Sequence, residues 1–229
     1  MTVIAIDGPA ASGKTTVGKL LAEALGYLFL DTGCMYRAAT LAVLQQGVDV
    51  EDETAVTHLT HTIDIDIQPI NGKQDGRQYT VMLNGNDVTW EIRSPQVDAN
   101  VSQVSTYHAV RQEMVRRQRD FGKRGKVIMV GRDIGTVVMP DAPLKLYVNA
   151  SPEERARRRW RDRSQQGHTA DYSAILADVI RRDKIDSGRK HSPLRPATDA
   201  LHIDSTSRSA TDIAEEIAEM VRNLEAISN

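Results

Sequence analysis

Solid apolar runs alternate with helical patterns along most of this 229-residue chain. Short runs in which nearly every position is apolar are typical of parallel strands that are covered on both faces. Between them, apolar residues recur three and four positions apart, which is the spacing of a helix with one buried face. The pattern predicts strands at 3–6, 27–30, 127–130, 144–148 and 201–203, and helices at 14–25, 35–46, 107–122, 172–184 and 211–224, with a further helix that begins at 152. Strands separated by helices predict a three-layer α/β fold around a central parallel sheet of five strands.

The stretch from 63 to 84 has a different pattern. Ile63, Ile65 and Ile67 alternate with polar residues, and the same alternation returns at 79–83. Strict alternation leaves one face of a strand in water, so a small antiparallel sheet is expected here as an insert in the parallel core.

Between the first predicted strand and the first predicted helix, the run Gly8–Thr15 fits GxxxxGK[ST] at every fixed position. A loop of this kind binds a nucleoside triphosphate, because its glycines let successive N–H groups point at the phosphates and the helix dipole adds to them. Lys14 is expected to reach the β and γ phosphates, and the Thr15 hydroxyl to bind Mg²⁺. The predicted nucleotide-binding residues are Gly8, Pro9, Ala10, Ala11, Ser12, Gly13, Lys14, Thr15 and Thr16.

Composition and charge narrow the alternatives. A net charge of −2 argues against wholesale binding of nucleic acid or of a membrane surface. The single cysteine, Cys34, excludes an internal disulfide, fits a reducing compartment and is expected to be a packed residue. We find no N-terminal signal region and no apolar run near 18 residues, which predicts a cytoplasmic protein. The histidines show no metal-site spacing, and because no exposed apolar stripe is obvious we expect a monomer.

Arginines stand where the chain leaves a predicted strand or enters the helix at 152. Arg37 comes after the second strand and Arg132 after the strand at 127–130, and the carboxyl ends of parallel strands are where α/β proteins bind ligands. The chain has no Asn-Lys-x-Asp run that could read guanine, which argues against a GTPase switch. Six further arginines crowd one predicted helix: Arg155, Arg157, Arg158, Arg159, Arg161 and Arg163.

Taken together, five runs resemble bacterial cytidylate kinases, a family of P-loop nucleoside monophosphate kinases. The resemblance covers essentially the whole chain and is far more specific than the phosphate loop alone. Cys34 stands where alanine is expected and Met139 where an aromatic residue is common, and neither position has a chemical role in the reaction that the resemblance implies. The runs are 8–15, 31–37, 131–138, 182–189 and 199–206.

The resemblance implies transfer of the γ-phosphoryl group from ATP to CMP or dCMP, with Mg²⁺ as cofactor. It also implies a core of residues 1–31, 108–150 and 169–229, a monophosphate-binding region at 32–107 with its insert at about 63–100, and a short lid at 151–168. Catalysis of this kind depends on positioning and on charge neutralisation, for which arginine is well suited. Within the lid, Gly167 is a candidate hinge.

By similarity, Arg37 and Arg132 hold the CMP phosphate, while Ser102, Arg111 and Asp133 read the cytosine. A carboxylate accepts from the cytosine 4-amino group and meets a carbonyl oxygen in uracil. Other interpretations stay open: a helix-face hydroxyl for Ser102, solvated or ion-paired charges for the arginines, and a water-mediated Mg²⁺ contact for Asp133.

Further along the chain, the match assigns Arg182 and Asp186 to the ribose hydroxyls and Arg189 to the nucleotide or its phosphate, although an i,i+4 ion pair between Arg182 and Asp186 is the plain alternative. The lid arginines either close over the phosphates or form a solvated charged face. The predicted CMP-binding residues are Thr32, Tyr36, Arg37, Ser102, Arg111, Arg132, Asp133, Arg182, Asp186 and Arg189, and the predicted catalytic residues are Lys14, Arg132, Arg155 and Arg159.

Two rival functions remain. One is a kinase of the same fold for UMP or AMP. The other is a nucleotide-dependent nucleic-acid-binding protein that uses the crowded arginines on phosphates. Two Phe and two Trp in the whole chain are few for base stacking, so we expect no stable nucleic-acid partner.

Overall fold

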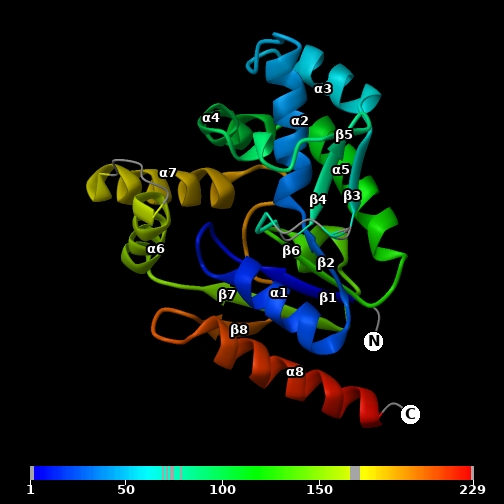
Figure 1. Ribbon diagram of the computed structural model, residues 1–229, viewed down its shortest axis with the longest axis vertical. Coiled ribbons are helices and arrows are strands. Elements are labelled where there is room, and N and C mark those ends of the chain that lie inside the picture. The colour runs from blue at the N-terminus through cyan, green and yellow to red at the C-terminus, as the bar shows by residue number, and fades with distance from the viewer. Residues whose placement is uncertain are drawn as a thin grey trace. The chain divides into compact units, whose positions relative to one another are not determined.

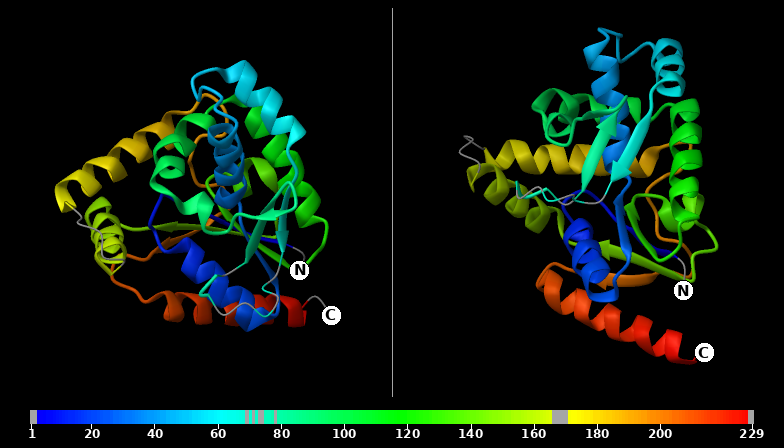
Figure 2. Two further views of the ribbon diagram at one scale, coloured as in Figure 1. Left: turned by 45° about the horizontal axis from the view of Figure 1, so that its top comes forward. Right: turned by 45° about the vertical axis from the view of Figure 1, so that its right-hand side comes forward.

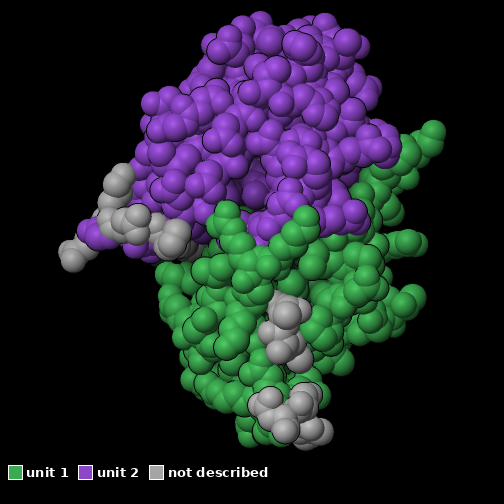
Figure 3. Space-filling view, turned by 90° about the vertical axis from the view of Figure 1, so that its right-hand side faces the viewer, with its two compact units in different colours: residues 1–30, 122–229 green, residues 31–121 purple. Residues whose placement is uncertain are grey.

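The structure is a computed structural model that describes residues 3–68, 70, 72, 75–77, 79–165 and 171–227 (Figure 1). It divides into two compact units (Figure 3): unit 1 comprises 1–30 and 122–229, and unit 2 comprises 31–121. The core expected from the sequence includes 108–121, whereas the structure places this segment in unit 2.

A sheet of five strands, in the order β2-β6-β1-β7-β8, lies at the centre of unit 1. Every residue of β1 and β6 is buried, because solid apolar runs need cover on both faces. The parallel register sets Asp7, at the end of β1, beside Gly131, at the end of β6. The predicted α/β fold with a parallel sheet is therefore confirmed. The strands are β1 (Val3–Asp7), β2 (Leu28–Asp31), β6 (Val127–Gly131), β7 (Leu144–Asn149) and β8 (Leu201–Asp204), and β2 ends on the first residue of unit 2.

Helices α1 (Lys14–Leu25) and α8 (Ala210–Ile227) pack together against this sheet (Figure 2). Their apolar stripes join the strand residues in one core. Gly18 lets α1 approach the sheet closely, since a Cβ there would lie 2.7 Å from the Val130 Cγ2. The close approach fixes the start of α1, and with it the phosphate loop, against the strands.

Helices α6 (Pro152–Gln165) and α7 (Tyr172–Gly188) form a second, smaller packing pair in unit 1, around Ala156 and Val179. The Ser151 hydroxyl accepts the Glu154 backbone N–H at 3.2 Å and so caps the start of α6. The Glu154 carboxylate pairs with Arg157 and Arg158. Residues 166–168 of the predicted lid, with Gly167, lie outside the described residues.

Unit 2 combines a three-stranded antiparallel sheet with a group of helices. Ile65 faces Leu83 and Ile67 faces Val81, all four side chains are buried, and the predicted antiparallel insert is confirmed. Its elements are β3 (Ile65–Gln68), β4 (Thr80–Leu83), β5 (Asn86–Asp87), the 3-10 turn η1 (Glu91–Arg93), α2 (Gly33–Gln45), α3 (Glu53–Thr62), α4 (Pro95–Val104) and α5 (His108–Gly122), whose last residue belongs to unit 1.

Two of these helices, α3 and α4, are absent from the sequence prediction. Each buries few side chains, so its apolar stripe is faint: Val56 and Thr60 in α3, Val97 and Val104 in α4. The N-cap residues of both helices could have marked where the helices begin. In α4, Ser94 precedes Pro95 at the first turn, and its hydroxyl accepts the Val97 N–H at 3.4 Å. No described helix combines the length and the apolar composition that a bilayer span requires.

Candidate active site

The phosphate loop connects β1 to α1 in unit 1. Gly8 adopts φ 152° where an added Cβ would lie 2.0 Å from the Val148 carbonyl oxygen, so no side chain fits. Gly13 caps α1 with φ 88°. The Lys14 side chain is buried and its Nζ donates to the Pro9 carbonyl at 2.7 Å, which places the ammonium across the loop. The predicted loop residues are therefore brought together around one cationic centre at a helix N-terminus.

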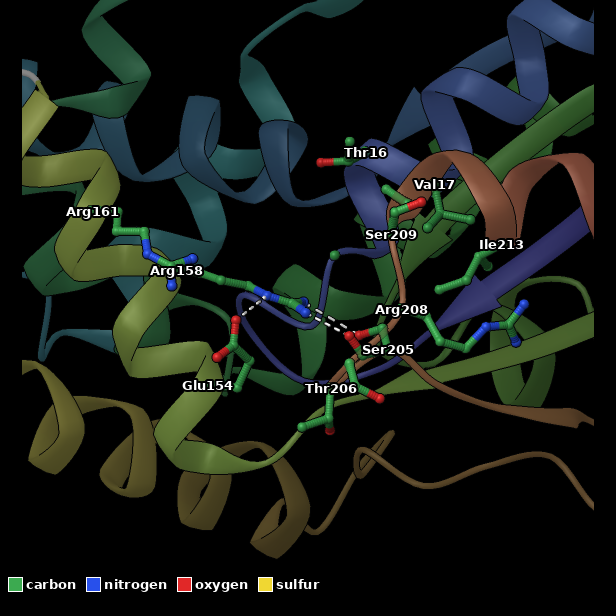
Figure 4. Close-up of a pocket in the computed structure, with 13 residues that line it drawn as sticks. Thr16, Val17, Glu154, Arg158, Arg161, Ser205, Thr206, Arg208, Ser209 and Ile213 are labelled. Atoms are coloured by element: carbon green, nitrogen blue, oxygen red, sulfur yellow. Dashed lines mark hydrogen bonds and ion pairs between the residues drawn. The ribbon is translucent and has the colours of Figure 1, made fainter.

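A pocket of about 470 Å³ opens beside the loop, between α1, α6 and the segment that joins β8 to α8 (Figure 4). Arg158 extends from α6 toward that segment, where its Nη2 donates to the Ser205 carbonyl at 2.5 Å. Ser205 in turn donates to the Ser12 carbonyl at 2.7 Å. The pocket thus joins the phosphate loop to a wall rich in hydroxyl groups. Its lining includes Gly13, Thr16, Arg158, Arg161, Ser205, Thr206, Ser207, Arg208 and Ser209.

A smaller pocket of about 260 Å³ opens onto the phosphate loop itself. Lys14, Thr15 and Thr16 line it together with Arg158 and Asp162 from α6. The cationic Lys14 of the loop and the guanidinium of Arg158 lie around one pocket, which favours the binding of a polyphosphate.

Arg155, a predicted catalytic residue, is 2% exposed and lies against the phosphate loop. Its two terminal nitrogens donate to the Asp183 carboxylate at 2.9 and 2.5 Å, and one of them also reaches the Ala10 carbonyl at 3.3 Å. Its Nε donates to the Ala150 carbonyl at 2.9 Å. These contacts join α6, α7 and the phosphate loop.

Arg159, the other predicted catalytic arginine of α6, pairs with Asp178 on α7 at 3.1 Å. Asp178 also pairs with Arg182, at 3.2 Å, and with Arg181. Burial favours the neutral form of Asp178, but these guanidinium groups outweigh it and hold its pKa below the ordinary value. Four of the crowded arginines of α6, Arg155, Arg157, Arg158 and Arg159, are therefore paired with carboxylates.

A second cluster lies where β6 ends. The Arg132 Nε donates to the Asp186 carboxylate at 2.9 Å, and Arg189 pairs with the other oxygen of the same carboxylate. Burial raises the pKa of Asp186, but the charges of Arg132 and Arg189 outweigh it, so the carboxyl stays below its ordinary pKa. Asp133, beside Arg132, is 4% exposed. The structure thus brings three predicted CMP-binding residues, Arg132, Asp186 and Arg189, together from the ends of β6 and α7.

The remaining predicted residues belong to unit 2. Arg37, on α2, donates to the Ile92 carbonyl at 3.0 Å and to Asp98 on α4 at 2.6 Å. Ser102 lies one helical turn beyond Asp98, and Thr32 is the buried residue that precedes α2. Arg37 therefore contacts the helix that carries Ser102.

Tyr36 and Arg111 are brought into contact in unit 2. The Arg111 guanidinium lies 5.3 Å from the centre of the Tyr36 ring, and its Nη1 donates to the Ser105 carbonyl at 3.1 Å. Arg111 is 3% exposed, which removes the interpretation of a solvated helix charge. Cys34, as expected, is packed: it is 2% exposed, and burial followed by the charge of Asp31 raises the pKa of its thiol well above the usual value.

Sequence reasoning missed the pocket wall and one buried carboxylate. Ser205 and Thr206 lay inside a run that carried the resemblance, and a cluster of hydroxyl residues directly after a short strand was the signal that could have marked them. Asp7 ends the first strand, immediately before the phosphate loop, and an acidic residue in an otherwise apolar strand was the second signal.

The fold and the phosphate loop define a P-loop nucleotide-binding protein. A sequence profile described as "Cytidylate kinase" matches residues 4–223. A cytidylate kinase of Roseiflexus castenholzii is 51% identical over 93% of this chain and 90% of its own length. The corresponding proteins of Bacillus pumilus and Bacillus subtilis are each 47% identical, over 97% and 95% of this chain and 96% and 95% of their own lengths. The chain belongs to the cytidylate kinase family, whose members phosphorylate CMP and dCMP with ATP.

Solved structures of small-molecule kinases are more distant. A shikimate kinase from Acinetobacter baumannii superposes with a TM-score of 0.45 at 16% identity, over 97% of this chain and 94% of that one, and carries no argument about the substrate.

Proposed function

We propose that this chain transfers the γ-phosphoryl group of ATP directly to the phosphate of CMP or dCMP, and that the residues of the candidate active site carry out the reaction. The observation that supports this most is the combination of a buried Lys14 in a phosphate loop with the cluster of Arg132, Asp186 and Arg189 in the same unit. One group suits the donor phosphates and the other suits a nucleoside monophosphate.

The donor nucleotide is assigned to the phosphate loop and its pockets. Backbone N–H groups and Lys14 neutralise the phosphate charge, which is where most of the rate enhancement of phosphoryl transfer arises. Mg²⁺ fits this site, because it is held by one or two protein oxygens together with substrate phosphates, and Thr15 lines the smaller pocket. When bound, the ion neutralises charge on the transferred group, and Thr15 is the residue that would hold it.

For the acceptor, Arg37 and Arg132 are assigned to the CMP phosphate, since planar guanidinium groups bind phosphate through two parallel hydrogen bonds. Arg182, Asp186 and Arg189 are assigned to the sugar and the phosphate beside it. The carboxylate of Asp186 suits a vicinal diol, and its two arginine partners keep it ionised for that role.

Cytosine recognition is assigned to Ser102, Arg111 and Asp133, with Thr32 and Tyr36 as further contacts. Arg111 is buried in unit 2, where the Tyr36 ring and the Ser105 carbonyl face its guanidinium. A guanidinium has five N–H donors in a rigid fork, so a group held in this way can also donate to the acceptor atoms of a base edge.

Arg155 and Arg159 are assigned a role in catalysis. Their contacts suit the positioning of α6 and the phosphate loop better than direct contact with the transferred phosphoryl group. Both hold α6 to α7, and Arg155 also supports the loop at Ala10. The segment 151–168 is proposed to close over the phosphates and to exclude water, which competes with CMP for the phosphoryl group.

The test measures ADP formation from ATP and Mg²⁺ with CMP, dCMP, UMP and AMP supplied singly. Fast turnover with CMP and dCMP is expected, and Lys14→Ala should lower kcat by about 100-fold or more. Lys19→Ala, further along α1 and partly exposed, is the matched control and should keep its activity. Preference for UMP or AMP would overturn the assignment of Arg111 and Asp133, and equal activity of Lys14→Ala would overturn that of the phosphate loop.

A further inference from the structure

Asp7 is a buried carboxylate that none of the proposed roles uses. It ends β1, is 3% exposed, and is followed directly by Gly8, the first residue of the phosphate loop. Buried acidic groups are uncommon because a charge costs free energy when it leaves water. The burial of this carboxylate therefore needs an explanation, which its contacts provide.

Both oxygens of Asp7 bind the backbone of one neighbouring turn. Oδ1 accepts the Ile134 N–H and Oδ2 accepts the Gly135 N–H, each at 2.8 Å. These two residues begin a single π-helical turn, η2 (Ile134–Val138), whose first residues have N–H groups with no partner inside the turn. Asp133 stands at the N-cap, but its side chain makes no capping hydrogen bond. Asp7 thus caps this turn from another strand.

The turn packs against Asp7 and against the side chain of Lys145. A Cβ added to Gly135 would lie 3.4 Å from the Asp7 Oδ2 and 3.2 Å from side-chain carbons of Lys145. Register places Asp7 opposite Gly131, so the segment held by the carboxylate is the one that leaves β6 and carries Arg132 and Asp133. One side chain therefore connects the start of the donor loop to two proposed acceptor-binding residues.

The burial of Asp7 disfavours the ionised form of its carboxyl group. Burial raises the pKa of Asp7 to about 6, against the two backbone hydrogen bonds that lower it, and the facing charges are Asp133, which raises it, and Lys14, which lowers it. A carboxyl with a raised pKa opposes folding when it is ionised at neutral pH. A neutral residue would avoid that cost.

We propose that Asp7 is a positioning residue for the acceptor: by capping the turn at Ile134 and Gly135, it holds Arg132 and Asp133 at the end of β6 in the arrangement that binds CMP. The proposal rests on the proposed function of Arg132 and Asp133. In this proposal, Asp7 acts on CMP binding through these two residues.

Asp7→Asn is the first variant, since it keeps the shape but turns an amide NH₂ toward one of the two N–H groups. The KM for CMP is expected to rise about 10-fold or more, because small displacements of a binding group are costly, while the KM for ATP changes less than about threefold. Asp141→Asn, at an exposed aspartate, is the control for removal of one negative charge. An equal rise of both KM values would overturn the proposal, because Asp7 would then act on the phosphate loop.

A double-mutant cycle with Arg132→Ala separates this proposal from the proposed function. If Asp7 acts through Arg132, adding Asp7→Asn to Arg132→Ala raises the KM for CMP less than about threefold further. Full multiplication of the two effects would overturn the positioning of Arg132 by Asp7 while it leaves Arg132 in the acceptor site. An unchanged KM for CMP in Arg132→Ala alone would reject the role of Arg132 itself, and the positioning proposal with it.

Gly135→Ala serves if Asp7→Asn does not fold, as judged by circular dichroism. It leaves the carboxylate in place and adds a methyl group 3.4 Å from the Asp7 Oδ2 and 3.2 Å from carbons of the Lys145 side chain, so the turn or that side chain has to shift. Where the kinetics change, the same selective rise in the KM for CMP is expected, and an equal rise in the KM for ATP would overturn the proposal.

Discussion

Arg155 joins three parts of unit 1 through one side chain. Its guanidinium binds the Asp183 carboxylate with two nitrogens and the backbone carbonyls of Ala10 and Ala150 with the same group. Each of its three nitrogens donates to a protein oxygen, and only 2% of the residue is exposed. Arg155 therefore stabilises the phosphate loop by joining Ala10 to Asp183 on α7.

Arg155→Ala is therefore expected to lower the free energy of unfolding by about 2–4 kcal/mol, because a partly buried carboxylate and two carbonyls lose their partner. Urea denaturation measures this change. Arg157→Ala is the matched control on the same helix: the Arg157 side chain is 50% exposed, pairs with Glu154, and should contribute less than about 1 kcal/mol. Equal stability of the two variants would contradict the supporting role.

At the residue scale, sequence could identify Lys14 and its loop because their chemistry is local and the spacing is fixed. Arg155 and Arg159 could only be assigned to a face of α6. Their partners, Asp183 and Asp178, lie on another helix, and no spacing within α6 indicates which arginine meets which carboxylate. The alternative pair of Arg182 with Asp186 was open for the same reason, and the structure pairs Arg182 with Asp178 and Asp186 with Arg132.

Among the elements of unit 2, α5 is fastened to the end of α3. Arg117 on α5 donates to the Ile63 carbonyl, just beyond α3, at 2.8 Å, and Glu113 one turn earlier holds Arg117 at 2.6 Å. The Glu113 side chain is 8% exposed, and its contacts with Arg116, followed by Arg117, lower its pKa to about 2. The carboxylate orients the arginine that satisfies the helix end.

This arrangement gives stability a pH dependence of known sign. The pKa of Glu113 is lower in the folded chain than in the unfolded one, so its contribution is present above about pH 4.5 and is lost as the pH falls toward about 2. Glu113→Gln should lower the free energy of unfolding by about 1–2 kcal/mol at pH 7, a value reduced because Arg116 is largely exposed, and by less at pH 3.

Urea denaturation of Glu113→Gln and of the parent chain at pH 7 and pH 3 tests this. Asp120→Asn is the control, because Asp120 is a half-exposed partner of the same Arg116. A difference between Glu113→Gln and the parent that grows on acidification would show that the sign is wrong.

Elements with strong patterns were predictable, and elements defined by a few contacts were not. Predicted strands and α1 have the bounds of the structure to within one or two residues, since their apolar patterns are complete. The turn η2 carries no periodic signal, and its position depends on a carboxylate from β1 more than 120 residues earlier in the chain. Local sequence does not encode such a partner.

For the molecule as a whole, the exposed apolar side chains come from separate segments. In the described part of the chain, the large ones are Leu28, Ile70, Trp90, Trp160, Ile180, Leu201 and Leu224. Each lies on a different element or loop, and single exposed apolar residues of this kind are ordinary on a monomer.

We therefore expect a monomer. Light scattering coupled to size exclusion should give the mass of one chain across a roughly 100-fold range of concentration, because scattered apolar residues give little drive for self-association. A mass that doubles as the concentration rises would refute this.

The burial of Cys34 has a practical consequence for this protein. It is the one cysteine in the sequence, it is 2% exposed, and its thiol resists ionisation, whereas alkylating reagents need an accessible thiolate. A cysteine introduced at Lys19 in unit 1 or at Asp120 in unit 2, both substantially exposed, would then be the reactive thiol, with the native residue left in place. Such a variant would take up a fluorescent dye or a spin label at the chosen position, so that its motions could be followed spectroscopically while nucleotides bind.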